Sequence, residues 1–138
     1  MNILVTGGSG YIGSHTVVLL INLGYKVTVL DNLCNSSKIV IDRINKITNS
    51  NCEFFEGDIT NKNDLSRLLS NKKFDAVLHF ASLKSVKDSI ENPQSYYSNN
   101  VSGTLTLINM LRKHNIYNII FSSSATVYGK DAKIPYTE

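Results

Sequence analysis

The sequence predicts a doubly wound α/β domain with a parallel sheet of about five strands in the order 3-2-1-4-5. Short apolar runs alternate with longer stretches in which apolar residues recur every three or four positions, which is typical of βαβ units. The apolar runs are continuous, as in strands covered on both faces. A glycine-rich turn, Gly7 to Gly13, follows the first run, where such folds open their first helix. Right-handed crossovers then give the predicted strand order.

The first half of the chain predicts three strands and two helices. Gly24 stands where a glycine ends the first helix, and the polar residues 48–51 end the second. The strands are expected at 3–6, 26–31 and 52–56, and the helices at 11–23 and 39–47.

The second half predicts two further helices and two strands. Thr60 or Asn61 can cap a helix that carries Leu65, Leu68 and Leu69. The remaining expected elements are a strand within 75–81, a loop to about 93, a long helix over 96–114 and a strand at 119–121.

Composition narrows the class of protein. The 138 residues are 42% hydrophobic and 18% charged, which suits one globular domain. The net charge is +3 and the basic residues are scattered, so we expect no nucleic-acid partner. Cys34 and Cys52 have no metal-ligand spacing, so no metal is expected. The longest apolar stretch, 17–21, is far too short for a membrane span, and a cytoplasmic location is the expectation.

The glycine pattern predicts a dinucleotide site. Gly7, Gly10 and Gly13 are spaced to allow a tight turn and close backbone approach to phosphate at a helix N-terminus. Asp31 follows Gly13 by 18 residues, at the end of the second strand, where a carboxylate can accept hydrogen bonds from a ribose diol. A 2′-phosphate would be repelled there, so NAD is favoured over NADP. These features predict a Rossmann-type fold with its site at the carboxyl ends of strands one and four.

Polar residues at the other strand ends are weaker candidates. Asp58 and Ile59 can touch adenine, Lys84 can reach a ribose or phosphate, and Ser124 can hydrogen-bond a reacting substrate oxygen. Taken alone, such residues are more commonly turn, surface or capping residues. His79 lies within an apolar strand and is expected to be a satisfied core histidine.

Five segments closely resemble the UDP-glucose 4-epimerases of the extended short-chain dehydrogenase/reductase family. The resemblance covers the whole chain, and its motifs are Gly7–His15, Asp31–Ser36, Glu56–Ile59, His79–Ala81 and Phe121–Gly129. It implies NAD-dependent interconversion of UDP-glucose and UDP-galactose, in galactose metabolism, by transient oxidation at the fourth carbon of the sugar. It also implies a homodimer for the full-length protein.

The resemblance assigns roles to individual residues. Tyr11 and Ile12 would contact the pyrophosphate through their backbone, and Ser124 would hydrogen-bond the reacting hydroxyl. Ser82 stands where the family usually has glycine and adds bulk beside the cofactor. The other implied cofactor residues are Asp31, Asn35 and Ser36 at the adenosine ribose and nearby groups, Asp58 and Ile59 at adenine, and Phe80, Ala81, Lys84 and Asn99 along the nicotinamide half. The loop that begins at Asn32 could cover the adenine side.

The family's catalytic base is the tyrosine of a Tyr-x-x-x-Lys motif, and none of the seven tyrosines here has a lysine four residues later. We therefore expect residues 1–138 to be an incomplete NAD-binding domain, inactive alone, with the C-terminal part of the fold and the substrate domain outside the chain. Two alternatives stay open. One is another NAD-dependent sugar-nucleotide enzyme, such as a 4,6-dehydratase or a uronate epimerase, and the other is a non-catalytic NAD-binding module.

Overall fold

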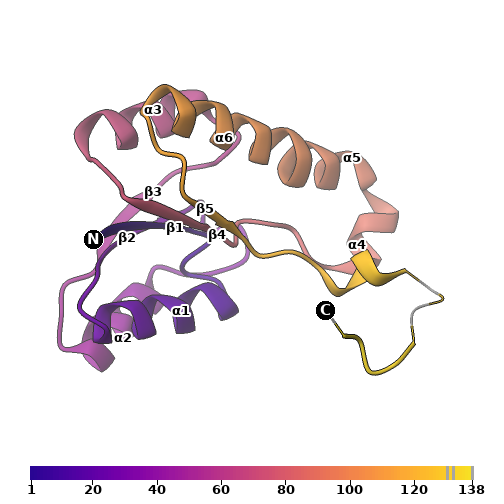
Figure 1. The fold of residues 1–138 in the computed structure, drawn as a ribbon, viewed down its shortest axis with the longest axis horizontal. Coiled ribbons are helices and arrows are strands. Elements are labelled where there is room, and N and C mark those ends of the chain that lie inside the picture. Colours follow the sequence, from indigo (N-terminus) through magenta and orange to yellow (C-terminus); the bar gives the residue numbers. More distant parts are fainter. Residues whose placement is uncertain (130, 132, 138) are drawn as a thin grey trace.

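A single parallel sheet of five strands forms the centre of the computed structural model, which describes residues 1–129, 131 and 133–137 (Figure 1). Its strand order, β3-β2-β1-β4-β5, is the predicted one. Thr6 at the end of β1 lies opposite Leu30 of β2 and His79 of β4, so the strand carboxyl ends meet at one edge. The strands are β1 (Asn2–Thr6), β2 (Lys26–Asp31), β3 (Glu53–Glu56), β4 (Ala76–His79) and β5 (Ile119–Phe121).

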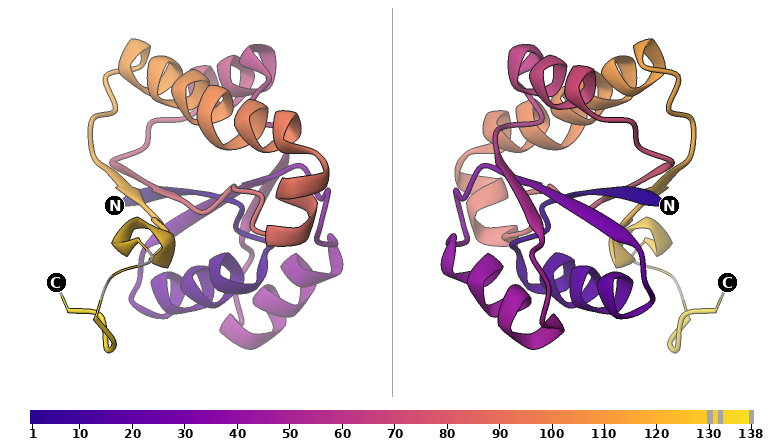
Figure 2. Two further views of the ribbon diagram at one scale, coloured as in Figure 1. Left: turned by 90° about the vertical axis from the view of Figure 1, so that its right-hand side faces the viewer. Right: turned by 90° about the vertical axis from the view of Figure 1, so that its left-hand side faces the viewer.

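Helices cover both faces of the sheet, as a doubly wound fold requires (Figures 1 and 2). The helices α1 (Tyr11–Asn22) and α2 (Ile39–Thr48) pack on one face. The helices α3 (Lys62–Asn71) and α6 (Thr104–Lys113) pack on the other. In the described residues, no helix is long and apolar enough to span a membrane.

Burial on two faces explains the continuous apolar runs of the central strands. In β1, Ile3 and Val5 belong to the core beneath α1 and α2, whereas Leu4 belongs to the core beneath α3 and α6. At the edge, β5 pairs with β4, and its Ile120 and Phe121 remain more than half exposed. Continuous apolar sequence therefore marks a buried strand at the centre of this sheet but not at its edge.

The segment between β4 and β5 differs from the prediction in two ways. The expected loop contains the helix α4 (Val86–Glu91), which the sequence did not reveal because it buries no residue. The expected helix over 96–114 begins earlier, with α5 (Pro93–Tyr96), and continues through the π-helix η1 (Tyr97–Gly103) into α6. Proline at the first helical position is the reason for the earlier start, because that position needs no backbone donor.

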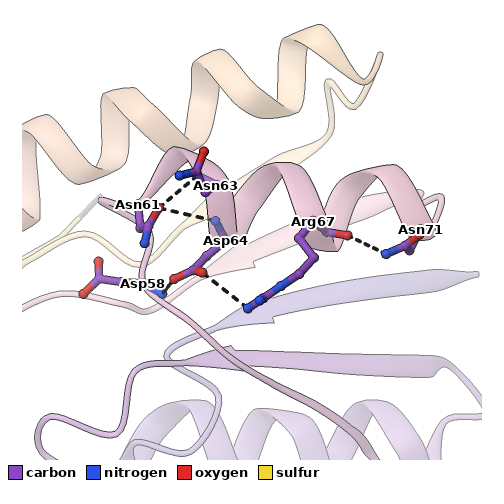
Figure 3. A network of polar contacts seen from close by, with 6 residues as sticks. All are labelled: Asp58, Asn61, Asn63, Asp64, Arg67 and Asn71. Carbon is purple, nitrogen blue, oxygen red and sulfur yellow. Dashed lines mark hydrogen bonds and ion pairs between the residues drawn. The ribbon is translucent and has the colours of Figure 1, made fainter.

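Asn61 is the cap of α3 (Figure 3). Its side-chain oxygen accepts hydrogen bonds from the backbone N–H of Asn63 at 2.9 Å and of Asp64 at 3.4 Å. The Asp64 carboxylate in turn accepts from the backbone N–H of Asp58 and pairs with Arg67 at 3.4 Å. This network ties the start of α3 to the turn after β3.

Replacing Asn61 with alanine is expected to lower the free energy of unfolding by about 1 kcal/mol, because two helix N–H groups lose their acceptor. Urea unfolding measures this change. Asn63→Ala is the matched control, since Asn63 is exposed and contributes its backbone N–H. Equal losses in the two variants would contradict the capping role.

Candidate functional site

A cavity of about 300 Å³ opens at the carboxyl ends of the strands, where the sequence places the site. All five strand ends and the π-helix contribute to its wall. The residues that line it are Gly7, Gly10, Tyr11, Ile12, Gly13, Leu30, Asp31, Asn32, Cys34, Asn35, Gly57, Ile59, Phe80, Ala81, Ser82, Leu83, Lys84, Asn99 and Ser122. Every residue proposed for the cofactor except Ser36 and Asp58 is therefore brought to one cavity by the described part of the chain.

The glycine turn brings backbone to the floor of this cavity. Gly7 has a φ of +69°, and a Cβ at this position would lie 2.7 Å from the backbone nitrogen of Ala81. A Cβ at Gly13 would overlap the Gly7 carbonyl oxygen. Gly10 caps α1 without a side chain, so the backbone N–H groups of the first helical turn face no carboxylate or hydroxyl cap. Such a helix end suits a phosphate group.

Asp31 links the glycine turn to the loop after β2. Its buried carboxylate accepts hydrogen bonds from the Ser9 N–H at 3.0 Å, the Leu33 N–H at 2.9 Å and the Ser36 hydroxyl at 3.2 Å. A carboxylate offers about four acceptor positions, so capacity for a ligand hydroxyl is left. Ser36 contacts the site through Asp31 and Ser9 rather than through the cavity wall.

Asp58 and Ile59 follow β3, and only Ile59 lines the cavity. The Asp58 carboxylate accepts hydrogen bonds from Asn32 at 2.8 Å and from the Thr60 N–H and hydroxyl at 2.7 Å. Partial burial raises the pKa of Asp58, but the bonds from Thr60 and Asn32 outweigh it, so the pKa lies below its ordinary value. Asp58 therefore holds Asn32 at the rim, while the buried Ile59 joins the core to the cavity wall.

The loop after β4 supplies the opposite wall. Phe80 is hydrogen-bonded through its backbone N–H to the Thr6 carbonyl at 2.9 Å, which sets the loop beside the glycine turn. Lys84 and Ser82 line the cavity, and the Asn99 amide approaches the Ala81 carbonyl at 3.5 Å. Ser82 thus presents a side chain in the position where the family usually has none.

The serine run follows β5. Ser122 lines the cavity, and its backbone N–H donates to the His79 carbonyl at 3.1 Å. Ser124 is exposed two residues further on, and its carbonyl accepts from the Val127 N–H at 3.1 Å as the chain enters the 3₁₀ turn η2 (Ala125–Tyr128). Among the described residues, the cavity wall therefore includes Ser122 and stops short of Ser124.

His79 is the satisfied core histidine that its apolar strand predicts. It is fully buried, with Nδ1 at 2.6 Å from the Thr6 hydroxyl and Nε2 at 2.9 Å from the Thr104 hydroxyl. Burial, with the positive charge of Lys84 as a smaller contribution, lowers the pKa of His79 to about 4. The ring is therefore neutral at physiological pH.

Sequence reasoning passed over some residues of this wall. Leu30 and Gly57 line the cavity with no polar side chain to mark them, although their positions at the ends of β2 and β3 point there. The described residues hold no group of three His, Cys, Asp or Glu side chains suited to a metal ion.

Known proteins share sequence similarity with this chain over its whole length. A family model described as GDP-mannose 4,6 dehydratase matches residues 4–138. The chain is 52% identical to a UDP-glucose 4-epimerase of Haemophilus influenzae over 138 residues, which are 100% of this chain and 41% of that protein. It is 50% identical to a UDP-glucose 4-epimerase of Klebsiella pneumoniae, covering 100% of this chain and 99% of the relative. The chain belongs to the UDP-glucose 4-epimerase family.

Solved structures of this family share the fold closely. A UDP-glucose 4-epimerase of Bifidobacterium longum, in complex with NAD⁺ and UDP, superposes with a TM-score of 0.97 at 43% identity, covering 100% of this chain and 41% of that one. The enzyme of Stenotrophomonas maltophila, with bound NAD and a formylated UDP-arabinopyranose, gives 0.94 at 43% identity, with 99% and 40% covered. The chain thus spans about two fifths of the Haemophilus influenzae relative and of these two solved structures.

Because His79 is buried, we expect the free energy of unfolding to fall at acidic pH. Its native pKa of about 4 lies below the ordinary value of 6.5, so the unfolded chain binds the proton more readily. The stabilisation is complete above pH 6.5 and is lost as the pH falls toward 4, which amounts to about 3 kcal/mol at 1.4 kcal/mol per pKa unit. Urea unfolding at pH 7 and at pH 4.5 measures most of this difference.

His79→Gln is expected to remove most of that pH dependence, whereas the exposed His15→Gln should retain it. Asp58 does not contribute to this difference in stability, because its pKa is lowered and it changes charge only at more acidic pH. A His79→Gln variant that keeps the full pH dependence would show that another group causes it.

Proposed function

We propose that this chain is the NAD-binding part of an enzyme that interconverts UDP-glucose and UDP-galactose. The observation that carries the proposal is the single cavity that joins the glycine turn, Asp31 and the loop after β4. Most of the residues that the family resemblance implies for the cofactor line this cavity, and Ser82 is the departure from the family pattern. Identity of about 50% to curated UDP-glucose 4-epimerases supports the same assignment.

The cavity fits NAD by its chemistry. At Gly7 and Gly13 there is no room for a Cβ, because the neighbouring backbone lies too close. The N-terminus of α1 has no side-chain cap, so its N–H groups can bind the pyrophosphate. Asp31 can accept a hydrogen bond from the adenosine ribose and would repel a 2′-phosphate. Asn32, Asn35 and Ile59 would enclose the adenine side, and Phe80, Lys84 and Asn99 would border the nicotinamide side.

NAD, when bound, supplies reversible oxidation at the fourth carbon of the sugar. The part of this chain that would meet the sugar follows β5, where Ser122 lines the cavity and the exposed Ser124 comes two residues later. We assign to the Ser124 hydroxyl the hydrogen bond to the reacting sugar hydroxyl. The Tyr-x-x-x-Lys pair and the domain that grips UDP would come from the part of the protein outside these residues.

Product analysis with UDP-glucose tests the activity in the protein at its native length. The proposal expects UDP-galactose. Ser124→Ala is expected to lower kcat about 10- to 100-fold, because a hydrogen bond to a group that gains charge contributes about 1.5–3 kcal/mol. Ser123→Ala, one residue away, is the control and should change kcat less than about twofold. Equal losses in both variants would contradict the role of Ser124.

A 4,6-dehydratase is the second candidate, because the matching family model carries that description for a GDP-mannose enzyme. A dehydratase would release a dehydrated keto sugar in place of the epimer, so the same product analysis separates the two. A protein that binds NAD and yields neither product would support a non-catalytic module.

We also propose that the full-length protein forms a homodimer through the helix that runs from α5 to α6. Tyr97, Val101, Leu105 and Ile108 follow one helical stripe, and each is between 42% and 71% exposed. Apolar residues at this spacing usually pack against another helix, and a symmetric pair of such stripes is self-complementary.

Leu105→Glu is expected to raise the dimer dissociation constant at least about 100-fold, because a two-fold interface would bury two unpaired carboxylates. Sedimentation velocity of the native-length protein measures the change. Leu19→Glu serves as the control, since Leu19 is similarly exposed on α1, on the opposite face of the sheet. A dimer that persists in Leu105→Glu at the affinity of the unaltered protein would exclude this helix as the interface.

A further inference from the structure

The side chain of Asn100 holds the backbone of Leu83 at two points. Its Oδ1 accepts the Leu83 N–H at 2.9 Å, and its Nδ2 donates to the Leu83 carbonyl at 3.0 Å. The pair joins residues 17 apart in sequence and satisfies both backbone groups of Leu83, much as a neighbouring strand would. Leu83 lines the cavity, so this contact fixes part of its wall.

The backbone of Asn100 is itself held by a hydrogen bond from Thr104, one turn further along the helix. The Thr104 hydroxyl donates to the Asn100 carbonyl at 2.8 Å, so it accepts from His79 Nε2 at 2.9 Å. His79 Nδ1 then accepts from the Thr6 hydroxyl at 2.6 Å, and both Thr6 and His79 are fully buried. A continuous line of hydrogen bonds thus runs from the end of β1 through β4 to the helix and back to the loop.

The π-helix brings a second amide to the same loop. Asn99 and Asn100 are adjacent in η1, yet both side chains face the segment after β4. Asn99 Nδ2 donates to Asn100 Oδ1 at 2.9 Å and approaches the Ala81 carbonyl at 3.5 Å. Single π-turns inside helices are frequent at functional sites, and here the π-turn coincides with the contact to the cavity wall.

We propose that Asn100 is a positioning residue, which fixes the loop after β4 and thereby the nicotinamide side of the cofactor site. The proposal rests on the proposed function, because it takes the bound dinucleotide to be NAD. Asn100 acts through Leu83 and does not line the cavity in the described chain. The adenosine side has its own supports in Asp31 and the glycine turn, so the two halves of the ligand should respond differently to a change at Asn100.

Two variants and a control test this in the protein at its native length. Asn100→Ala removes both hydrogen bonds to Leu83, and Asn100→Asp keeps the acceptor for its N–H but loses the donor to its carbonyl. Asn109→Ala is the control, since Asn109 is exposed on the same helical run. Amide hydrogen exchange at Leu83 measures the contact directly, without any ligand. Exchange should accelerate most in Asn100→Ala and less in Asn100→Asp, whose carboxylate keeps the acceptor for the Leu83 N–H but faces the Leu83 carbonyl without a donor. It should stay unchanged in the control.

Binding supplies the second readout. NAD and ADP are titrated into nucleotide-free protein, because ADP carries the adenosine and pyrophosphate parts and lacks the nicotinamide side. The dissociation constant of NAD should rise about tenfold in Asn100→Ala, which is the size of effect expected from the loss of one hydrogen bond. It should rise less in Asn100→Asp. That of ADP should stay within about twofold of the unaltered protein.

The two titrations can contradict the role of Asn100 in two ways. Equal weakening of NAD and ADP would show a general structural loss, and unchanged NAD affinity would show that the loop needs no such support, so either result overturns the role of Asn100. The proposed function fails separately, if the unaltered protein binds no NAD while exchange at Leu83 still depends on Asn100.

Discussion

The arrangement of the site depends on how closely the backbone at Gly7 approaches the backbone at Ala81. A Cβ at Gly7 would lie 2.7 Å from the Ala81 nitrogen, and the Phe80 N–H is bonded to the Thr6 carbonyl immediately before the turn. The end of β1 and the loop after β4 therefore form one surface. Because parallel strands end at the same edge, the residues that directly follow the strands are brought to this edge of the sheet.

From this contact the two sides of the cavity are supported by different means. On the side proposed for adenosine, the buried Asp31 carboxylate accepts hydrogen bonds from the glycine turn and from its own loop. The side proposed for nicotinamide lies on the loop after β4. This loop is held by the Asn100 amide, and Asn100 is connected to the buried His79 through Thr104. Burial keeps that histidine neutral, so its Nδ1 can accept and its Nε2 can donate at once.

Much of this could be predicted from the sequence, because the strongest signals were local. Continuous apolar runs marked the strands, and the glycine spacing with Asp31 pointed to the sheet edge at which the cavity lies. The helix α4 escaped because it buries nothing, and the π-helix left no periodic signature of its own. Asn100 escaped for a different reason, since its role depends on a partner 17 residues away that contributes only backbone.

Different supports also imply different tolerance to change. Cavity residues near Asp31 are constrained by a carboxylate that accepts three hydrogen bonds, so substitution there disturbs the glycine turn as well as the ligand. The wall at Leu83 is constrained through its backbone, so its position in the loop depends on the Asn100 amide rather than on the Leu83 side chain. Ser82 is likewise held through its backbone, because its N–H donates to the Phe80 carbonyl at 2.8 Å, while its side chain lines the cavity.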